Sequence, residues 1–193
     1  CSSLFMRVPL PAARTMMARG GAEAGAESVM EQTFASIRLP FPAGAAIGQH
    51  MTDFPFQIVG FDLDGTLCDT HGDLGVAVNH ALSLAGRPSV PIADVRDLVG
   101  GGALKMLERA LEVTGGILPR EQVRELHREL VRFYEANIAV HSRLFPGGAA
   151  MLDGLADRGV KIAVATNKLE SLAVKLLDAL QLSPRFYTVI GGD

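Results

Sequence analysis

The sequence predicts an α/β fold in which a parallel sheet carries an inserted block of helices. Three short apolar runs, at residues 56–61, 160–165 and 187–190, have the length and flanking turn signals of strands buried on both faces. Between the first two runs, apolar residues recur at helical spacing in successive segments without a strand pattern among them. This order predicts a Rossmann-like parallel core with a helical cap.

The expected elements follow one another in a simple order. The first strand, at 56–61, leads into an acidic loop at 62–70. The other elements are helices at 72–85, 104–113, 121–140, 149–158 and 169–182, and strands at 160–165 and 187–190. Glycine and proline separate several of these elements, as at 86–88 and 145–147, where they disfavour continuation of the preceding pattern.

Residues 1–50 differ in composition from the rest of the chain. They mix proline, glycine and alanine with arginine, contain no lysine and sustain no long amphipathic pattern. We interpret them as a disordered or non-native extension, and an organelle targeting segment remains an alternative. The rest then divides into a core at 51–71 and 144–193 and a cap at 72–143.

The composition argues against several classes of function. A net charge of −3 provides no basic surface for a nucleic-acid backbone, and no segment has the apolar length of a membrane span. Two cysteines are too few for a disulfide framework, so we expect a cytoplasmic protein in which Cys68 is a small buried residue. The expected partner is therefore a small molecule, and the sequence leaves the oligomeric state open.

Polar residues directly follow the first two expected strands. Asp62 and Asp64 end the first strand, and Thr166 and Asn167 end the second. Ligands of open α/β sheets bind at the carboxyl ends of the strands, where these residues should meet. Two carboxylates that are two residues apart on extended backbone project to the same side and suit a hard cation such as Mg²⁺. We therefore expect Asp62 and Asp64 to bind this metal.

The turn after the two acids has features of a phosphate-binding loop. Gly65 allows close approach of the backbone, and N–H groups through Thr66 can donate to phosphate oxygens. A plain Asx turn would use the same residue types. However, the string Asp-Leu-Asp-Gly-Thr-Leu at 62–67 follows an apolar strand, and Thr-Asn-Lys at 166–168 follows another, which makes a chance match improbable.

The chain resembles the haloacid dehalogenase superfamily of aspartate-nucleophile phosphatases, and within it the bacterial phosphoglycolate phosphatases. The resemblance extends over residues 56–193. The motifs that carry it are Phe-Asp-Leu-Asp-Gly-Thr-Leu at 61–67, Val-Gly-Gly-Gly at 99–102, Phe-Pro-Gly at 145–147, Ala-Thr-Asn-Lys at 165–168 and Val-Ile-Gly-Gly-Asp at 189–193. The first and fourth motifs indicate the superfamily, and the others favour the subfamily.

The resemblance implies hydrolysis of a small phosphate ester, with 2-phosphoglycolate as the expected substrate. Asp62 would attack phosphorus and form an aspartyl-phosphate, while Asp64 protonates the leaving alkoxide and then activates water. Mg²⁺ would bind the Asp62 side chain and the Asp64 backbone carbonyl, and Thr166 and Asn167 would bind phosphoryl oxygens. A sugar-phosphate phosphatase, a phosphomutase and a catalytically incompetent fragment remain alternatives.

Further expectations concern residues around this site. By resemblance, Gly100, Gly101 and Gly102 belong to a cap loop that sets substrate specificity, and a plain flexible connection is equally open. Lys105 and Arg96 are candidate partners of a substrate carboxylate, with a solvated face as the alternative. We expect Lys168 to have a structural or rim role, because the family's phosphate-binding lysine comes later in the chain.

Relative to the family pattern, the chain is truncated at its C-terminus. The resemblance implies a lysine and a pair of metal-binding acids beyond Asp193. We therefore expect the 193-residue chain by itself to be a poor catalyst. We also expect the strand at 56–61 to have an uncovered edge, because a strand that would lie beside it is missing.

Overall fold

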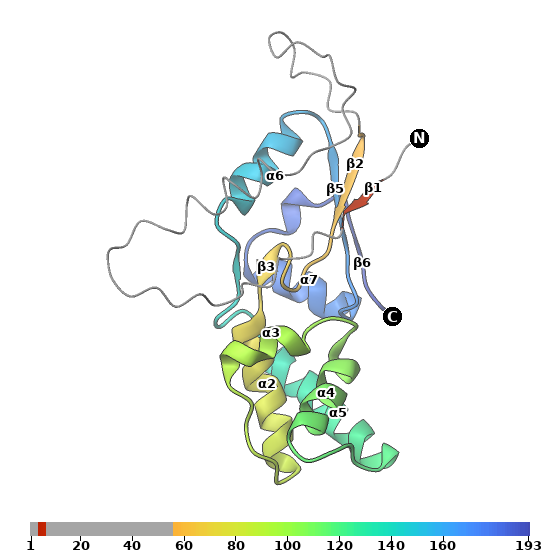
Figure 1. Cartoon of the computed structure of the whole chain (residues 1–193). Coiled ribbons are helices and arrows are strands. Elements are labelled where there is room, and N and C mark those ends of the chain that lie inside the picture. The colour runs from red at the N-terminus through yellow and green to blue at the C-terminus, as the bar shows by residue number, and fades with distance from the viewer. Residues whose placement is uncertain (1–3, 7–55) are drawn as a thin grey trace, which may run out of the picture. The chain divides into compact units, whose positions relative to one another are not determined.

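The computed structural model describes residues 4–6 and 56–193 (Figure 1). The strands are β1 (Leu4–Met6), β2 (Ile58–Phe61), β3 (Cys68–Asp69), β4 (Arg143–Leu144), β5 (Lys161–Ala165) and β6 (Thr188–Ile190). The α-helices are α2 (His71–Leu84), α3 (Val95–Leu98), α4 (Ala103–Val113), α5 (Arg120–Ala136), α6 (Gly148–Ala156) and α7 (Glu170–Ala179). Two 3₁₀ turns, η1 (Ile92–Asp94) and η2 (Ser183–Arg185), complete the described elements.

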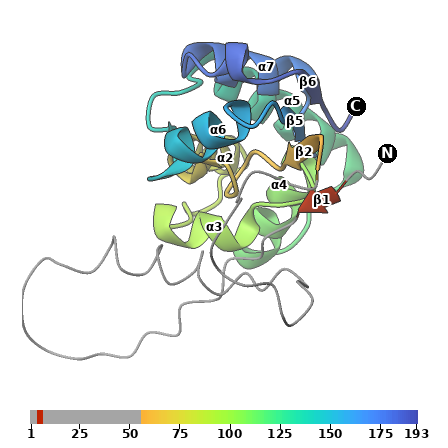
Figure 2. The same cartoon turned by 90° about the horizontal axis from the view of Figure 1, so that it is seen from above.

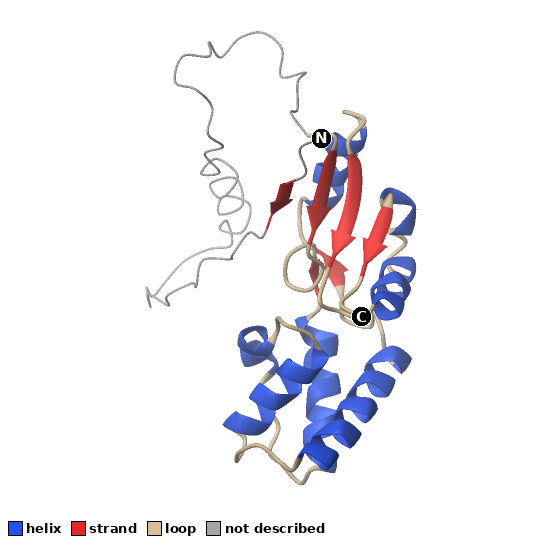
Figure 3. Ribbon diagram, turned by 90° about the vertical axis from the view of Figure 1, so that its right-hand side faces the viewer, coloured by secondary structure: helices blue, strands red, loops and turns tan. Residues whose placement is uncertain are grey.

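Four strands form one parallel sheet in the order β1-β2-β5-β6. Phe61 of β2 lies opposite Val164 of β5, and Ala165 of β5 lies opposite Ile190 of β6. Parallel strands place their carboxyl ends at one edge, and in Figure 3 the arrowheads of the sheet point towards the inserted helices. The predicted α/β class with a parallel core and inserted helices is confirmed.

The outer edge of β2 differs from the expectation. Strand β1 pairs with it in parallel, with Leu4 opposite Val59 and Met6 opposite Phe61. The expectation of an uncovered edge is therefore wrong, because β2 has a hydrogen-bonded strand on both sides. The other residues of the expected N-terminal extension, 1–3 and 7–50, lie outside the described residues.

One face of the sheet is covered by α6 and α7. Ile162 and Val164 are two residues apart on β5, so their side chains project to the same face. Both belong to one apolar cluster with Leu152 of α6 and Leu176 of α7. Figure 2 shows the two helices on the same side of the strands. The apolar positions of these elements are thus explained by packing on the sheet.

Helices α2, α4 and α5 share a second apolar cluster. Its buried members include Val78 and Leu82 of α2, Leu107 of α4 and Leu130 of α5. The cluster also includes Leu172 of α7, so the division into a sheet core and a helical cap with boundaries at 72 and 143 stays a prediction. Among the described helices, none has both the length and the apolarity needed to cross a membrane.

A small antiparallel ribbon lies where the chain enters and leaves the helical insert. Strand β3 pairs with β4, with Cys68 opposite Leu144. Close by, the buried Asp73 carboxylate accepts hydrogen bonds from the backbone N–H groups of His141 and Ser142 at 2.8 and 2.9 Å. It also accepts one from the Ser142 hydroxyl at 2.6 Å. These contacts join the first turn of α2 to the returning chain.

The helix expected at 121–140 ends earlier, at Ala136. The side-chain amide of Asn137 donates to the carbonyl oxygen of Phe133 at 2.8 Å, and this bond satisfies a carbonyl at the helix end. Ala139 then has a φ of +62°, which no right-handed helix contains. The chain therefore leaves the helix four residues before the predicted end.

Candidate active site

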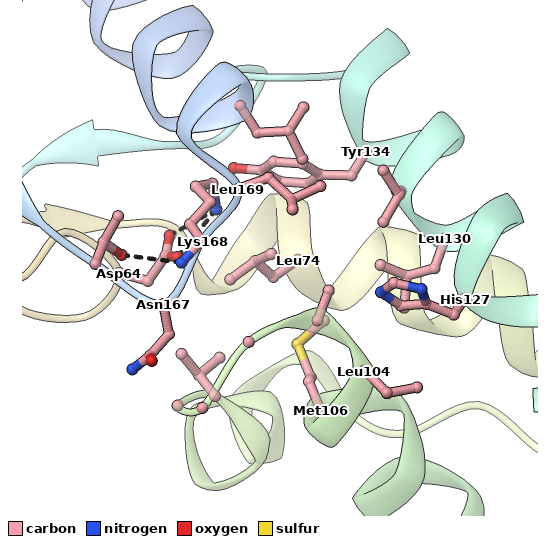
Figure 4. Close-up of a pocket in the computed structure, with 18 of the residues that line it drawn as sticks. Asp64, Leu74, Leu104, Met106, His127, Leu130, Tyr134, Asn167, Lys168 and Leu169 are labelled. Atoms are coloured by element: carbon pink, nitrogen blue, oxygen red, sulfur yellow. Dashed lines mark hydrogen bonds and ion pairs between the residues drawn. The ribbon is translucent and has the colours of Figure 1, made fainter. Parts of the chain in front are cut away.

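A cavity of about 210 Å³ lies at the carboxyl ends of β2 and β5 and reaches the inserted helices (Figure 4). Its lining from the sheet side includes Asp62, Asp64, Thr166, Asn167 and Lys168. From the inserted helices and their loops it includes Gly100, Gly101, Gly102, His127, Leu130 and Tyr134. Two strand ends that are far apart in the sequence thus meet at one cavity.

The two acids of the loop have different surroundings. The Asp64 carboxylate accepts a hydrogen bond from the Thr70 hydroxyl at 2.8 Å and two from Lys168 Nζ at 2.9 and 3.0 Å. The Asp62 carboxylate has no hydrogen bond or ion pair with another described residue. Asp62 is therefore available to a ligand or cation, while Asp64 is held by two neighbours.

Lys168 is a buried residue of the cavity, which fits the structural role expected for it and not a position at the rim. Its side chain is 5% exposed, and Nζ lies 4.4 Å from the centre of the Tyr134 ring. Burial lowers the pKa of Lys168, but attraction by Asp64 and Tyr134 outweighs burial and raises this pKa above its ordinary value. A carboxylate and an aromatic face together compensate for the loss of water around the ammonium group.

Thr166 and Asn167 line the cavity at the end of β5. The Thr166 N–H donates to the Ile190 carbonyl at 3.0 Å, and its hydroxyl accepts a bond from the Lys168 N–H at 3.3 Å. The backbone N–H of Asn167 has no partner among the described residues. The Thr166 hydroxyl proton and the Asn167 N–H can therefore both be donated to a ligand oxygen.

The turn after Asp64 does not line the cavity. Gly65 has a φ of +75°, and its N–H donates to the Cys68 carbonyl at 2.9 Å. The Thr66 N–H donates to the Leu63 carbonyl at 3.4 Å. Both N–H groups are used within the turn itself, so this arrangement does not support the expected phosphate contacts of Gly65 and Thr66, which stay a prediction.

The three consecutive glycines line the cavity from the side of α4. Gly100, Gly101 and Gly102 have φ values of +112°, +83° and +91°, a region in which glycine is strongly favoured. A Cβ atom on Gly102 would lie 3.2 Å from the carbonyl oxygen of Asn167. A side chain at position 102 would therefore crowd the backbone of Asn167, next to the end of β5.

The two cations expected to meet a substrate carboxylate do not line the cavity. Lys105 is exposed. Arg96 lies 3.7 Å from the buried Asp69 carboxylate, which also contacts His71 and, at 3.6 Å, Arg143. One side chain points to solvent and the other pairs with an acid elsewhere, so their roles in substrate specificity stay a prediction that the structure does not support.

Two polar groups of the cavity were not among the site residues predicted from the sequence. Tyr134 is buried, its hydroxyl has no hydrogen-bond partner among the described residues, and burial raises its pKa to about 12. His127 also lines the cavity, and burial lowers its pKa. His127 and Tyr134 lie three and four residues from Leu130 in the sequence, so the three side chains share one face of α5. Polar groups within the apolar stripe of α5 were the signal that could have identified this face.

The oxygen donors of the cavity fit part of a magnesium site. Asp62 has a carboxylate without a partner, as a hard cation requires. The Asp64 side chain is engaged by Lys168, so Asp64 would contribute its backbone carbonyl. In the part of the chain that is described, no three His, Cys, Asp or Glu side chains gather as a metal site. The remaining ligands would be phosphate oxygens and water.

Comparison with known proteins agrees with this arrangement. Residues 56–193 match the family model of haloacid dehalogenase-like hydrolases. The phosphoglycolate phosphatase of Caulobacter vibrioides is 45% identical over 135 residues, which are 70% of this chain and 57% of that protein. The phosphoglycolate phosphatase of Agrobacterium fabrum is 41% identical over 144 residues, which are 74% of this chain and 62% of that protein.

A solved structure also resembles the described fold. The crystal structure of a predicted phosphoglycolate phosphatase from Haemophilus somnus 129pt aligns with a TM-score of 0.67 and 30% identity. The alignment covers 72% of this chain and 63% of that one. The chain thus spans about three fifths of the length of the curated relatives named above. Because the family model matches most of its length, the chain belongs to the haloacid dehalogenase-like hydrolases.

Proposed function

We propose that the protein is a Mg²⁺-dependent phosphatase that hydrolyses 2-phosphoglycolate to glycolate and phosphate. The observation that carries the proposal is the unpartnered Asp62 carboxylate at a strand end, with Asp64 two residues away in the same cavity. Relatives named phosphoglycolate phosphatase support this substrate.

Asp62 is the proposed nucleophile. An oxygen of its free carboxylate forms a bond to phosphorus while the bond between phosphorus and the leaving alkoxide oxygen breaks, which yields an aspartyl-phosphate. Water then attacks this phosphorus, the bond between phosphorus and the Asp62 oxygen breaks, and inorganic phosphate and the free Asp62 carboxylate result. Bound by the Asp62 side chain and the Asp64 carbonyl, Mg²⁺ would neutralise charge on the transferring phosphoryl group. The Thr166 hydroxyl and the Asn167 N–H are placed to donate to its other oxygens.

Asp64 is the proposed acid and base. It gives a proton to the departing alkoxide and takes one from the attacking water. In the structure its two oxygens accept three hydrogen bonds, from Thr70 and Lys168. A carboxylate has about four lone-pair positions, so one position on Asp64 is free to carry the proton. We also propose a cytoplasmic location, because two cysteines are too few for a disulfide framework and Cys68 is a free thiol.

The test is release of inorganic phosphate from 2-phosphoglycolate with Mg²⁺. The 193-residue chain and the product of the complete reading frame are both assayed, because the relatives are longer than the part that matches. Asp62→Asn should reduce turnover at least about a thousandfold, since removal of a nucleophile abolishes covalent catalysis. Asp157→Asn is the matched control, because Asp157 is exposed. Substantial turnover by folded Asp62→Asn protein would exclude the proposed mechanism.

A further inference from the structure

The Tyr134 hydroxyl is a buried polar group in need of a partner. The residue is 2% exposed, and its hydroxyl meets no described residue in the geometry of a hydrogen bond, although the Lys168 side chain lies against it. Burial of an unpaired hydroxyl destabilises a fold, so packing alone would favour phenylalanine at this position. In Figure 4 the ring extends from α5 towards Lys168 and Leu169, on the sheet side of the cavity. A ligand in the cavity could supply the missing partner.

Lys168 adds a charged donor beside this hydroxyl. It is the only lysine or arginine among the described residues that line the cavity, where Asp62 and Asp64 are acidic. An ammonium group has three N–H donors. Two suffice for the bonds to the Asp64 oxygens at 2.9 and 3.0 Å, which leaves one donor. The Tyr134 ring centre lies 4.4 Å from the same Nζ atom.

We propose that Tyr134 and Lys168 form a subsite for a carboxylate on the leaving-group side of the substrate. The hydroxyl and the ammonium group both donate, and a carboxylate offers two acceptor oxygens. A phosphoryl group bound at Asp62 and Thr166 leaves the rest of the substrate facing the inserted helices, from which Tyr134 comes. The inference rests on the proposed function and adds that the site selects phosphate esters with a carboxylate.

The protonation of Tyr134 is consistent with a donor role. Burial raises its pKa to about 12, although the charge of Lys168 acts in the opposite direction. The phenol therefore keeps its proton at neutral pH. The two other cations considered for a substrate carboxylate, Arg96 and Lys105, do not line the cavity.

The experiment compares two esters that differ in one group. Affinities for 2-phosphoglycolate and 2-hydroxyethyl phosphate, which has a hydroxymethyl group in place of the carboxylate, are measured by calorimetry with Mg²⁺. All proteins are the full 193-residue chain with Asp62→Asn, which prevents turnover. Without a further change, 2-phosphoglycolate should bind about tenfold more tightly, as expected for hydrogen bonds to a charged group. Tyr134→Phe should remove most of this preference and leave the affinity for inorganic phosphate unchanged.

The chain offers two matched controls. Tyr187 is the other tyrosine; it also has a lysine above its ring, with Lys161 Nζ at 4.2 Å from the ring centre, but it is 67% exposed. Tyr187→Phe should therefore leave the preference intact. Lys105→Met removes an exposed cation next to the glycine loop and should also leave it intact. Without ligand, Tyr134→Phe should keep or raise the melting temperature, because it removes an unpaired buried hydroxyl.

The inference is overturned if Tyr134→Phe keeps the preference for 2-phosphoglycolate over 2-hydroxyethyl phosphate. It is also overturned if Tyr134→Phe lowers the melting temperature of the ligand-free chain. A parent protein that binds the two esters equally, or binds neither, would overturn it as well. The proposed function is tested separately by phosphate release. Turnover of 2-phosphoglycolate together with a preference that does not depend on Tyr134 would reject only the subsite. Lack of turnover by the product of the complete reading frame would reject the proposed function itself.

Discussion

The Nζ atom of Lys168 lies 2.9 and 3.0 Å from the two carboxylate oxygens of Asp64, which is 104 residues earlier in the chain. The side chains of the pair are only 5% and 16% exposed. Charges that are this far removed from water depend on each other, because loss of one leaves the other buried and unpaired. The pair also connects the end of β2 to the end of β5, the two segments that bring residues to the cavity.

Lys168→Met should destabilise the fold strongly. We expect the free energy of unfolding in urea to fall by about 3–5 kcal/mol, as is typical when one partner of a buried pair is removed. Lys175→Met is the matched control, because Lys175 pairs with Glu135 at 3.4 Å and both side chains are about half exposed. That change should cost at most about 1 kcal/mol. Equal losses in the two variants would contradict the assigned importance of the buried pair.

The contribution of Lys168 should be insensitive to pH across the neutral and mildly alkaline range. Its pKa is raised in the folded state above the ordinary value of 10.5. A raised lysine pKa contributes stability that is fully present below the unfolded pKa and is lost as the pH rises through the folded one. The difference in melting temperature between the parent chain and Lys168→Met should therefore stay constant from about pH 7 to 9. A steady decrease over this range would contradict the direction of the shift.

Asp73 should be essential for the attachment of the inserted helices. Its carboxylate is 4% exposed and accepts three hydrogen bonds, two from backbone N–H groups at 141 and 142 and one from the Ser142 hydroxyl. Asp73→Ala leaves these donors without their acceptor, so we expect a loss of about 3–5 kcal/mol in unfolding free energy. Asp157→Ala, at an exposed position, is the control and should change stability by less than about 0.5 kcal/mol. A small loss for Asp73→Ala would show that solvent replaces these contacts.

The parts of the fold that the sequence predicted are those with a repeated signal. Strands β2 and β5 are continuous apolar runs, and α5 has Leu126 and Leu130 four residues apart on one buried face. Asp62 and Asp64 were identified because they directly follow one of these runs. The two-residue strands β3 and β4 and the four-residue helix α3 are too short to show any period. They form because tertiary contacts hold them.

The interactions of Lys168 could not be predicted for a different reason. A lysine after a strand is usually exposed, and its burial here depends on Asp64 from another strand end and Tyr134 from the inserted helices. Apolar periodicity shows that Tyr134 faces inward but not what lies opposite its hydroxyl. The pairing of β1 with β2 was missed because a three-residue strand has no pattern, and edge pairing is specified mainly by backbone groups.

Gly102 should be more important for activity than Gly100. Both residues have a positive φ, +91° and +112°, so alanine at either position should cost about 1 kcal/mol of stability. Only at Gly102 would the added Cβ meet the core, 3.2 Å from the Asn167 carbonyl oxygen, whereas nothing lies within 4 Å at Gly100. Such a contact is tighter than ordinary van der Waals distance, so the glycine loop or Asn167 must move.

Gly102→Ala should therefore lower the kcat/KM for 2-phosphoglycolate by about tenfold or more relative to Gly100→Ala. The reason is that a displaced Asn167 no longer positions its N–H towards a phosphoryl oxygen. The measurement compares both variants with the parent in the phosphate-release assay, together with their melting temperatures. Equal stability with unequal turnover would identify the close approach of Gly102 as the cause. Equal turnover in the two variants would show that the glycine loop needs its positive φ values but not its contact with Asn167.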